Sequence, residues 1–587
     1  MKGLKFNSRF TYYTNQQYYK RFTPKRTECG SPNPINELNG SSYKDNGCKT
    51  ENTITYDRTF GKHSVGALLA TTADHYNSRG NSINRKYFED ESENLQYLQY
   101  SNATPIVNDW YTGDDANVAF IARGSYSYDD RYFFTASWRR DIAGRLPEGH
   151  NYGDFPAVTG AWKISSEPFF PKMDALTFLK LRASWGRIGN LGSVPRNYKS
   201  ATLNTANDGK IAINGTETHS TIGARIWNGK ALNPNLTWET SEQFDLGLDA
   251  GFFRDRLNLG FDFYNKRTFN LIQEQKMNWP QSIGVSPMYI NLGEIQNRGI
   301  EISLGWSDKI GDFSYYVNGN AAYNKNTVLN IGVADAAGNS AVWENSFQYR
   351  DVRFYNRTEE GGELNQIYII KCLGLFQSDE EAANYVDKNG NRIQPNAVAG
   401  DLKFEDYNGD GKIDAGDRQM FGSSTPDWTY ALNLGFTWKK LSFSTMLQGV
   451  QGAQALQLGK MAYASMSSKV HNRSTDIYDS WSFNKNSNIP RISALDNNSN
   501  FMTGSSWYLE DSSYLRVKNV SISYDLTDAL RKINHFAERN SSALIYFSGE
   551  NLLTFTKYSG MDPECGQNDF LRYPVSRVFS FGVKLTY

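Results

Sequence analysis

The sequence of 587 residues predicts an all-β protein, a transmembrane antiparallel β-barrel of about sixteen strands. Aromatic residues make up 14% of the chain, and segments of about ten residues alternate apolar side chains with small or polar ones. Connections between these segments alternate between short turns and long loops, as in barrels that cross a membrane. A barrel is expected because an open strand edge in lipid leaves backbone N–H and C=O groups unpaired. No apolar run is long enough for a transmembrane helix.

Composition excludes several other classes of protein. Lys plus Arg and Asp plus Glu both number 62, so no basic face indicates nucleic-acid binding. The six His residues form no Ser/His/Asp pattern, and no phosphate-binding loop is present, so we expect no enzymatic activity.

The four cysteines lack a metal-ligand spacing. Cys29 and Cys48 flank one predicted loop and would form a disulfide in an oxidising compartment, or all four remain free thiols.

The predicted strands follow one another in pairs. In the first, Leu4, Phe6, Phe10 and Tyr12 alternate with polar residues. Short turns are expected at 61–62, 129–130, 254–255, 307–312 and 439–440. The sixteen segments are 4–12, 51–60, 63–76, 116–128, 131–141, 155–165, 176–190, 241–253, 256–267, 298–306, 313–326, 428–439, 441–452, 514–526, 542–555 and 577–587.

The final strand ends on the last residue of the sequence and has one apolar face. That face comprises Phe579, Phe581, Val583, Leu585 and Tyr587. A last strand that ends on an aromatic residue resembles the recognition signal for outer-membrane barrel assembly, although an ordinary amphipathic strand has the same alternation. If this strand ends in the periplasm, the short turns are periplasmic and the long loops extracellular. The helical segment Asp528–Glu538 would then lie on the periplasmic side.

An acidic loop lies in a predicted extracellular region, residues 327–426, after a helix with a capping box at Ser378 and Glu381. Its oxygen-bearing side chains have the spacing of an EF-hand loop, except that position 12 is Asp instead of Glu. The predicted ligands are Asp406, Asn408, Asp410, Lys412 (through its carbonyl), Asp414 and Asp417. This pattern favours a structural Ca²⁺ ion, and the alternative is an Asn-Gly/Asp-Gly turn that needs no metal.

Aromatic residues in the predicted loops are candidates for contact with a substrate or with a lid protein, because flat rings stack on sugars and are common at interfaces. They are Trp110, Tyr111, Trp227, Trp343, Trp481 and Trp507. For any single one of them, packing within a loop is the simpler role and the one that we favour. Arg139, Arg140 and Asp141 are candidates to line the inside of the barrel, either along a transport path or as a structural ion-pair network.

Several segments, in this order, resemble the SusC/RagA family of TonB-dependent outer-membrane transporters of Bacteroidetes. They are "RYFFTASWRRDIAGRL", "DFPAVTGAWKISSEPFF", "LKLRASWGRIGN", "WETSEQFDLGLDAGFFRDRLNLGFDFYNKRT", "NLGEIQNRGIEISLGW", "GDLKFEDYNGDGKIDAGDR", "YLRVKNVSISYDL" and "ENLLTFTKYSGMDPE". The family has a barrel of twenty-two strands, and residues 1–587 resemble strands seven to twenty-two. The family's signal peptide, N-terminal β-sandwich, TonB box, plug domain and six further strands are not visible, so the expectation is a partial barrel.

The resemblance implies import of large nutrients, either oligosaccharides and other glycans or peptides, at the cell outer membrane. It implies a SusD-like surface lipoprotein as a lid, and energy from TonB with ExbB and ExbD acting on the plug, which this stretch lacks. Other expected partners are outer-membrane lipid and the barrel assembly machinery. Two alternatives remain open: a passive porin-like channel of sixteen strands, or a secreted calcium-binding β adhesin. Detergent-dependent solubility would separate the adhesin from both barrels.

Overall fold

The structure is a computed structural model of the chain. It describes residues 2–586 except for 28–31, 102, 172, 197, 199–201, 206–209, 214–215, 220–223, 228–231, 275–287, 333–342, 350–351, 465–473, 494, 533–541 and 571. Within these described ranges, no helix is both long enough and apolar enough to span a membrane.

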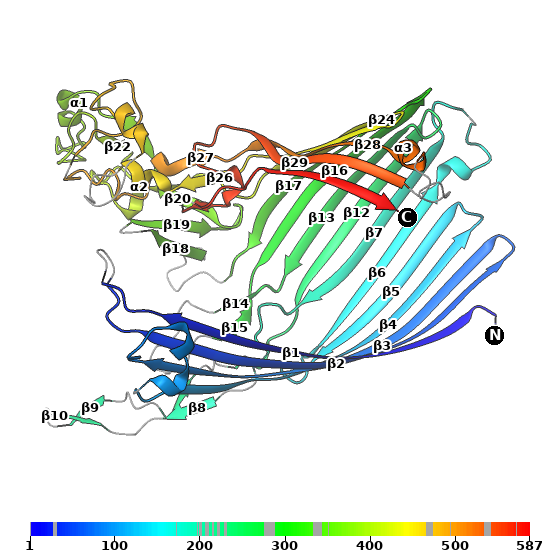
Figure 1. Cartoon of the computed structure of the whole chain (residues 1–587), viewed down its shortest axis with the longest axis horizontal. Helices are drawn as coiled ribbons and strands as arrows, with labels where there is room; N and C mark the ends of the chain where they lie inside the picture. Colours follow the sequence, from blue (N-terminus) through cyan, green and yellow to red (C-terminus); the bar gives the residue numbers. More distant parts are fainter. Residues whose placement is uncertain are drawn as a thin grey trace. The chain divides into compact units, whose positions relative to one another are not determined.

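The main feature is one sheet of sixteen strands, which confirms the predicted number and the all-β class. Neighbouring strands pair antiparallel, as β1 does with β2 and β29 with β31. In hydrogen-bonded order the strands are β1 (Leu4–Thr23), β2 (Glu37–Phe60), β3 (His63–Lys86), β4 (Ile106–Tyr128), β5 (Tyr132–Ala143), β6 (Tyr152–Lys163), β7 (Phe178–Asn190), β12 (Glu239–Phe252), β13 (Leu257–Phe269), β16 (Glu294–Ile310), β17 (Phe313–Asn330), β24 (Trp428–Trp438), β25 (Leu441–Gln451), β28 (Tyr514–Asp525), β29 (Ser542–Thr556) and β31 (Val578–Thr586). These strands appear as the long arrows of Figure 1.

The short turns lie where the sequence places them, with one adjustment. Gly61 has φ +59° in the turn between β2 and β3, and Asp129 and Asp130 both have φ +53° between β4 and β5. Positive φ at the centre of a tight hairpin matches the right-handed twist of the strands, and Asp tolerates it better than most residues. The turn expected over residues 307–312 contains only 311–312, because β16 continues to Ile310.

Strands near the N-terminus extend beyond their predicted ends, which corrects two assignments. β2 begins at Glu37 instead of residue 51, so Cys48 lies within a strand, paired with Tyr12 and His75, and not in a loop. β4 begins at Ile106, so Trp110 and Tyr111 are also strand residues. The added part of β2 is mostly polar on both faces, and in the added part of β4 the apolar residues come as adjacent pairs, Ile106 with Val107 and Trp110 with Tyr111. Neither segment therefore has the alternation that reveals a strand in sequence.

The predicted disulfide is not formed at Cys48, which carries a free thiol, as do Cys372 and Cys565. Cys29 lies outside the described residues.

The chain forms two compact units. Unit 1 comprises Met1–Trp162, Ala183–Phe244 and Thr268–Gly293, and unit 2 comprises Lys163–Arg182, Asp245–Arg267 and Glu294–Tyr587. Besides its part of the main sheet, unit 1 contains six short strands, which pair as β8 (Thr202–Thr205) with β11 (Ala224–Trp227), β9 (Lys210–Ile213) with β10 (Thr216–His219), and β14 (Ile272–Glu274) with β15 (Tyr289–Asn291).

In unit 1 the register separates two faces of the sheet. Phe6, Ile54, Leu69, Ala122 and Trp138 are consecutive partners across β1 to β5, and we call their side the apolar face. Its large side chains are exposed, Phe6 to 67% and Leu69 to 59%. The opposite side, the polar face, contains a row of Arg9, Glu51, Thr72, Ala119 and Asp141.

Unit 2 contains a folded loop region between β17 and β24, which corresponds to the region expected at 327–426. Its strands form a four-stranded sheet, β18 (Trp343–Tyr349), β19 (Val352–Thr358), β20 (Gln366–Ile370) and β23 (Arg418–Met420), and a pair, β21 (Cys372–Leu375) with β22 (Leu402–Phe404). A third small sheet of unit 2 joins β26 (Gln454–Gln457), β27 (Leu509–Asp511) and β30 (Asn568–Asp569).

The described residues of unit 2 include three short α-helices, and the sequence predicts two of them. α1 (Asp379–Ala383) begins at Ser378, whose side chain accepts a hydrogen bond from the Glu381 N–H, as the capping pattern predicts. α3 (Thr527–Arg531) is the start of the helical segment expected over Asp528–Glu538, whose residues from 533 onward lie outside the described part. α2 (Gly459–Ala464) was not predicted.

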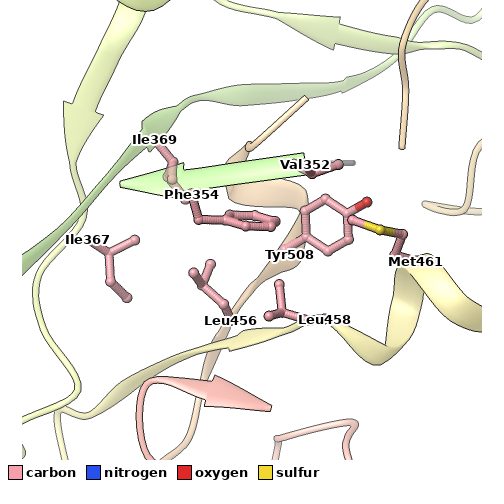
Figure 2. Close-up of a cluster of buried hydrophobic side chains, with 8 residues drawn as sticks. All are labelled: Val352, Phe354, Ile367, Ile369, Leu456, Leu458, Met461 and Tyr508. Carbon is pink, nitrogen blue, oxygen red and sulfur yellow. The ribbon is translucent and has the colours of Figure 1, made fainter. Parts of the chain in front are cut away.

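The folded loop region of unit 2 packs against later loops of the same unit in a shared hydrophobic core, shown in Figure 2. Tyr508 lies at its centre, fully buried, with its ring edge-to-face against Phe354 at a centroid distance of 5.4 Å. The Tyr508 hydroxyl donates a hydrogen bond of 2.9 Å to the Phe501 carbonyl oxygen. The other members are Val352, Ile367, Ile369, Leu456, Leu458 and Met461. Segments more than a hundred residues apart in sequence are thus held together by apolar packing.

Candidate functional site

The acidic loop is a tight turn held by bonds between its carboxylates and its own backbone. Asp406 accepts hydrogen bonds from the N–H groups of Gly409, Asp410 and Gly411, at 2.9 to 3.1 Å. Asp417 is fully buried and accepts from the N–H of Tyr407 at 2.9 Å. Because these bonds satisfy the carboxylates, they fix the loop backbone.

The remaining predicted ligands make similar local contacts. Asp414 and Asp417 form a reciprocal capping box around the short 3₁₀-helix Ala415–Asp417. Asp410 accepts from the Lys412 N–H at 3.0 Å, and Asn408 accepts from the Asp410 N–H at 2.9 Å. Across the part of the chain that the structure describes, no three His, Cys, Asp or Glu side chains converge as a metal site. Calcium binding by this loop therefore stays a prediction.

Two of the predicted contact aromatics, Trp507 and Trp481, pack inside the folded loops of unit 2. Trp507 lies edge-to-face against Phe501 and Tyr508, and its indole N–H donates to the Asn488 carbonyl oxygen at 3.0 Å. Trp481 packs against the cluster of Ile370, Leu375, Leu402 and Phe404, with the Lys485 ammonium 3.1 Å from its ring centroid. Both side chains stabilise the loops, and their contact with a substrate or a lid stays a prediction.

The other predicted contact aromatics belong to strands, although they were expected in loops. Trp110 and Tyr111 lie in β4, Trp227 is the last residue of β11, and Trp343 is the first residue of β18. Their contribution to binding stays a prediction.

The polar face of unit 1 surrounds a hollow of about 920 Å³. Arg9, Glu51, Arg123, Arg139 and Asp141 are among its lining residues, so the wall carries more positive than negative charge. Arg139 binds Asp141 through two hydrogen bonds of 2.6 and 2.7 Å. Such paired charges on a concave surface suit contact with polar molecules.

Arg140 does not share this surface, which corrects its grouping with Arg139 and Asp141. It pairs across the sheet with Phe120, whereas Arg139 pairs with Ile121, and consecutive strand residues point to opposite faces. Arg140 therefore belongs to the apolar face.

Sequence reasoning missed two aromatic residues of the hollow, Phe155 and Trp238. Their rings meet edge-to-face at 5.5 Å, and both line the hollow. They are 83 residues apart in the sequence, and only the pairing of β6, β7 and β12 brings them together. Gly189 lies beside both rings, and any side chain there would collide with Phe155. Aromatic and charged groups in one hollow can contact both the rings and the polar groups of a ligand.

In unit 2, a single guanidinium joins three adjacent strands. Arg182 of β7 binds Asp249 of β12 at 2.8 and 2.9 Å and Asp262 of β13 at 3.0 and 3.1 Å. Gly247 lies beside this cluster, where a larger residue would meet Arg182 and Asp262. The cluster has no sequence signal, because a long loop separates Arg182 from Asp249 and a turn separates Asp249 from Asp262.

The final strand has the face that the sequence predicts. Phe579, Phe581, Val583 and Leu585 of β31 are exposed to 63%, 74%, 56% and 60%. Tyr587 lies outside the described residues. The role of this face in barrel assembly stays a prediction.

Comparison with protein families gives one match over most of the chain. The family model described as "TonB dependent receptor-like, beta-barrel" matches residues 2–552.

Comparison with curated proteins gives relatives of the same kind. The chain is 27% identical to TonB-dependent receptor P3 of Formosa agariphila, over 100% of the chain and 56% of the relative. It is 28% identical to TonB-dependent receptor P26 of the same organism, over 92% and 53%. It is 23% identical to TonB-dependent receptor SusC of Bacteroides thetaiotaomicron, over 91% and 49%. The chain spans about half the length of these relatives.

Among solved structures, the chain is similar to the RagAB peptide transporter, with a TM-score of 0.76 at 23% identity, over 100% of the chain and 60% of the other. The RagAB peptide importer in its closed-closed state gives a TM-score of 0.78 at 22% identity, with the same coverage. At these identities the similarity shows a shared fold.

Proposed function

The chain belongs to the TonB-dependent receptor-like β-barrel family, and we propose from this that it forms wall strands of an outer-membrane importer for large nutrients. The cargo would be oligosaccharides or peptides. The protein would have no enzymatic activity, because its part in import is to bind and pass a solute rather than to change a covalent bond.

The observation that carries this proposal is the contrast between the two faces of unit 1. Phe6, Leu69 and Phe134 expose 67%, 59% and 53% of their surface on one side of the sheet. In water, a contiguous apolar surface of this kind is unfavourable, at about 25 cal/mol per Å². Lipid would cover it, while the charged hollow on the opposite side would face an aqueous passage. The exposed apolar face argues against the secreted adhesin.

The partners follow from the same proposal. A SusD-like surface lipoprotein would cover the extracellular mouth, where the folded loop region of unit 2 would meet it. Import would be driven by TonB with ExbB and ExbD. The barrel assembly machinery would insert the protein, with the apolar face of β31 as its recognition signal.

Two experiments test location and transport separately. For location, outer membranes from the native host are washed with high salt and then extracted with detergent. We expect the protein to leave the membrane only in detergent, and release by salt would contradict an integral position.

For transport, the gene is deleted and growth is measured with single oligosaccharides or peptides as the carbon source. We expect growth to fail on one class of polymer, to continue on its monomers, and to recover with the restored gene. Unchanged growth on every polymer tested would reject the import function and leave the membrane location standing.

A further inference from the structure

A tryptophan, an arginine and a carboxylate form a compact triad on the apolar face of unit 1. Arg140 of β5 binds Asp154 of β6 through two parallel hydrogen bonds of 2.8 and 2.6 Å. The indole N–H of Trp138 donates to the same carboxylate at 3.0 Å. The guanidinium carbon also lies 5.5 Å from the Trp138 ring centroid and 5.2 Å from that of Tyr152. Every polar group of the carboxylate and the indole is thus engaged.

The same arrangement occurs a second time on β7 and β12. Arg187 binds Glu242 through Nε at 3.0 Å and Nη2 at 2.9 Å. The indole N–H of Trp185 donates to Glu242 at 2.8 Å, and the Arg187 guanidinium lies 5.5 Å from the Trp185 ring centroid. Glu242 alternates along β12 with Phe244 and Leu246, which are exposed to 43% and 48%, so this triad also lies on an apolar side of its strand.

The two triads share one sequence pattern, Trp-X-Arg on one strand with a carboxylate on the next. Of the 13 tryptophans in the chain, only Trp138 and Trp185 are followed by arginine at the second position. The two triads also lie at similar positions along their strands. Gly186, inside the second pattern, lies next to Ala157 of β6, and Ala157 pairs with Ser137, the residue before Trp138.

The height of the first triad matches the edge of a lipid-covered band. β5 leaves its turn at Tyr132 and reaches Arg140 eight residues later. At about 3.3 Å per residue this is about 26 Å along the strand, or about 20 Å vertically for a tilt of about 40°. The apolar band of an outer-membrane barrel is about 25 Å tall. At the near end, Asp129 in the turn binds Lys62 at 2.9 Å. A charged pair therefore lies at each end of the apolar stretch of β5.

We propose that the two triads contact the phosphate-bearing head groups of the outer leaflet and set the depth of this wall in the membrane; this rests on the outer-membrane location proposed above. The internal ion pair makes each triad neutral, which lowers the cost of placing charges beside hydrocarbon. In each arginine, Nε and Nη2 bind the carboxylate. The Nη1 amino group remains to donate to a lipid phosphate oxygen. Tryptophan favours this same layer, where its ring is in lipid and its N–H is bonded.

The test measures depth on both sides of each triad. A nitroxide is attached through a cysteine, in a variant whose native cysteines are serine, at Ala136 or Ile142 of β5 and at Phe244 or Thr240 of β12. The full chain is inserted into vesicles of phosphatidylethanolamine and phosphatidylglycerol. The spin relaxation of each label is then measured with oxygen, which collects in hydrocarbon, and with a nickel complex, which stays in water. We expect oxygen to dominate at 136 and 244, and nickel at 142 and 240.

A matched pair of double variants tests the role of the charges. Arg140→Leu with Asp154→Leu removes the first triad's ion pair without leaving an unpaired charge, and extends the apolar stretch by two residues, about 7 Å. The label at 142 is then expected to become accessible to oxygen. Arg139→Leu with Asp141→Leu removes the neighbouring pair on the polar face, and is expected to leave the label at 142 in the nickel-accessible layer.

Three results would overturn the inference. If oxygen dominates at both 136 and 142, the boundary lies elsewhere. If the two double variants move the label at 142 equally, the Arg140–Asp154 pair has no specific role. If nickel dominates at all four positions, both this inference and the proposed membrane location fail, whereas the first two results leave the location intact.

Discussion

Arg182 and Asp249 form a bidentate ion pair between β7 and β12, with N–O distances of 2.8 and 2.9 Å. The other side of the same guanidinium binds Asp262 of β13. One positive charge thus lies between two carboxylates, and each of the three side chains is about one-third exposed to solvent. Without the arginine, two negative charges on adjacent strands would face each other.

Removing Arg182 is expected to destabilise this part of the wall. Arg182→Leu should lower the free energy of unfolding by about 1 kcal/mol. This is the low end of the cost of leaving a charged group unpaired, because solvent screens the partly exposed carboxylates. Arg267→Leu is the control, because Arg267 binds one carboxylate, Glu294, and should cost about 0.5 kcal/mol or less. Urea unfolding in vesicles, followed by tryptophan fluorescence, measures both. An equal effect of the two changes would contradict the double role of Arg182.

The folded loop region of unit 2 is expected to depend on Tyr508. Tyr508→Ala would open a cavity beside Phe354 and remove the hydrogen bond to Phe501, at a cost of about 3–5 kcal/mol. Hydrogen exchange should then rise by at least tenfold in β19 (Val352–Thr358), the strand that carries Phe354. Tyr407→Ala is the control, because Tyr407 is exposed to 63% and its removal leaves no cavity. Unchanged exchange in β19 would show that the loop is held by other contacts.

Calcium binding by the acidic loop is a separate prediction. Terbium replaces calcium at oxygen sites, and Tyr407 within the loop would sensitise its emission. We expect terbium luminescence that calcium displaces and that Asp410→Asn with Asp414→Asn abolishes. Tyr407→Phe should lose the luminescence while keeping the calcium affinity, measured by calorimetry. Luminescence equal in the wild type and the double variant would identify the loop as a turn that needs no metal.

Asp496 provides a pH-dependent prediction. Burial raises the pKa of this carboxyl above its ordinary value of 3.8, and the nearby charge of Asp401 raises it further, although the N–H groups of Asn500 and Phe501 oppose the shift. A raised folded-state pKa favours the protonated form, so this contribution to stability is complete below 3.8 and is lost as pH rises through the folded-state pKa. Hydrogen exchange in 496–508, corrected for its intrinsic pH dependence, should therefore increase between pH 4 and 8, and Asp496→Asn should flatten the change. A decrease of the exchange rate between pH 4 and 8 would contradict the predicted direction of this effect.

Prediction from the sequence worked where the chemistry of a strand is repeated along it. Alternation of apolar and polar residues identifies β24 and β25, and the two lysines between them mark their turn. The same rule failed for the first part of β2, because residues 37–50 are polar on both faces and carry no alternating signal. It also grouped Arg140 with Arg139, since the same residue type at neighbouring positions does not show which face each side chain takes.

The sequence by itself determined the strands of the wall, most of their turns, the helix that begins at Ser378 and the family resemblance. These features depend on local backbone preference and on the two-residue period of a strand, and both can be recognised from residues that are consecutive in the sequence. The tertiary structure decided the partners. Arg182 with Asp262, Arg187 with Glu242 and Phe155 with Trp238 are separated by 80, 55 and 83 residues, and strand pairing brings each pair together. Ion pairs and ring contacts act over a few ångströms, so they form only after the sheet has fixed which strands are neighbours.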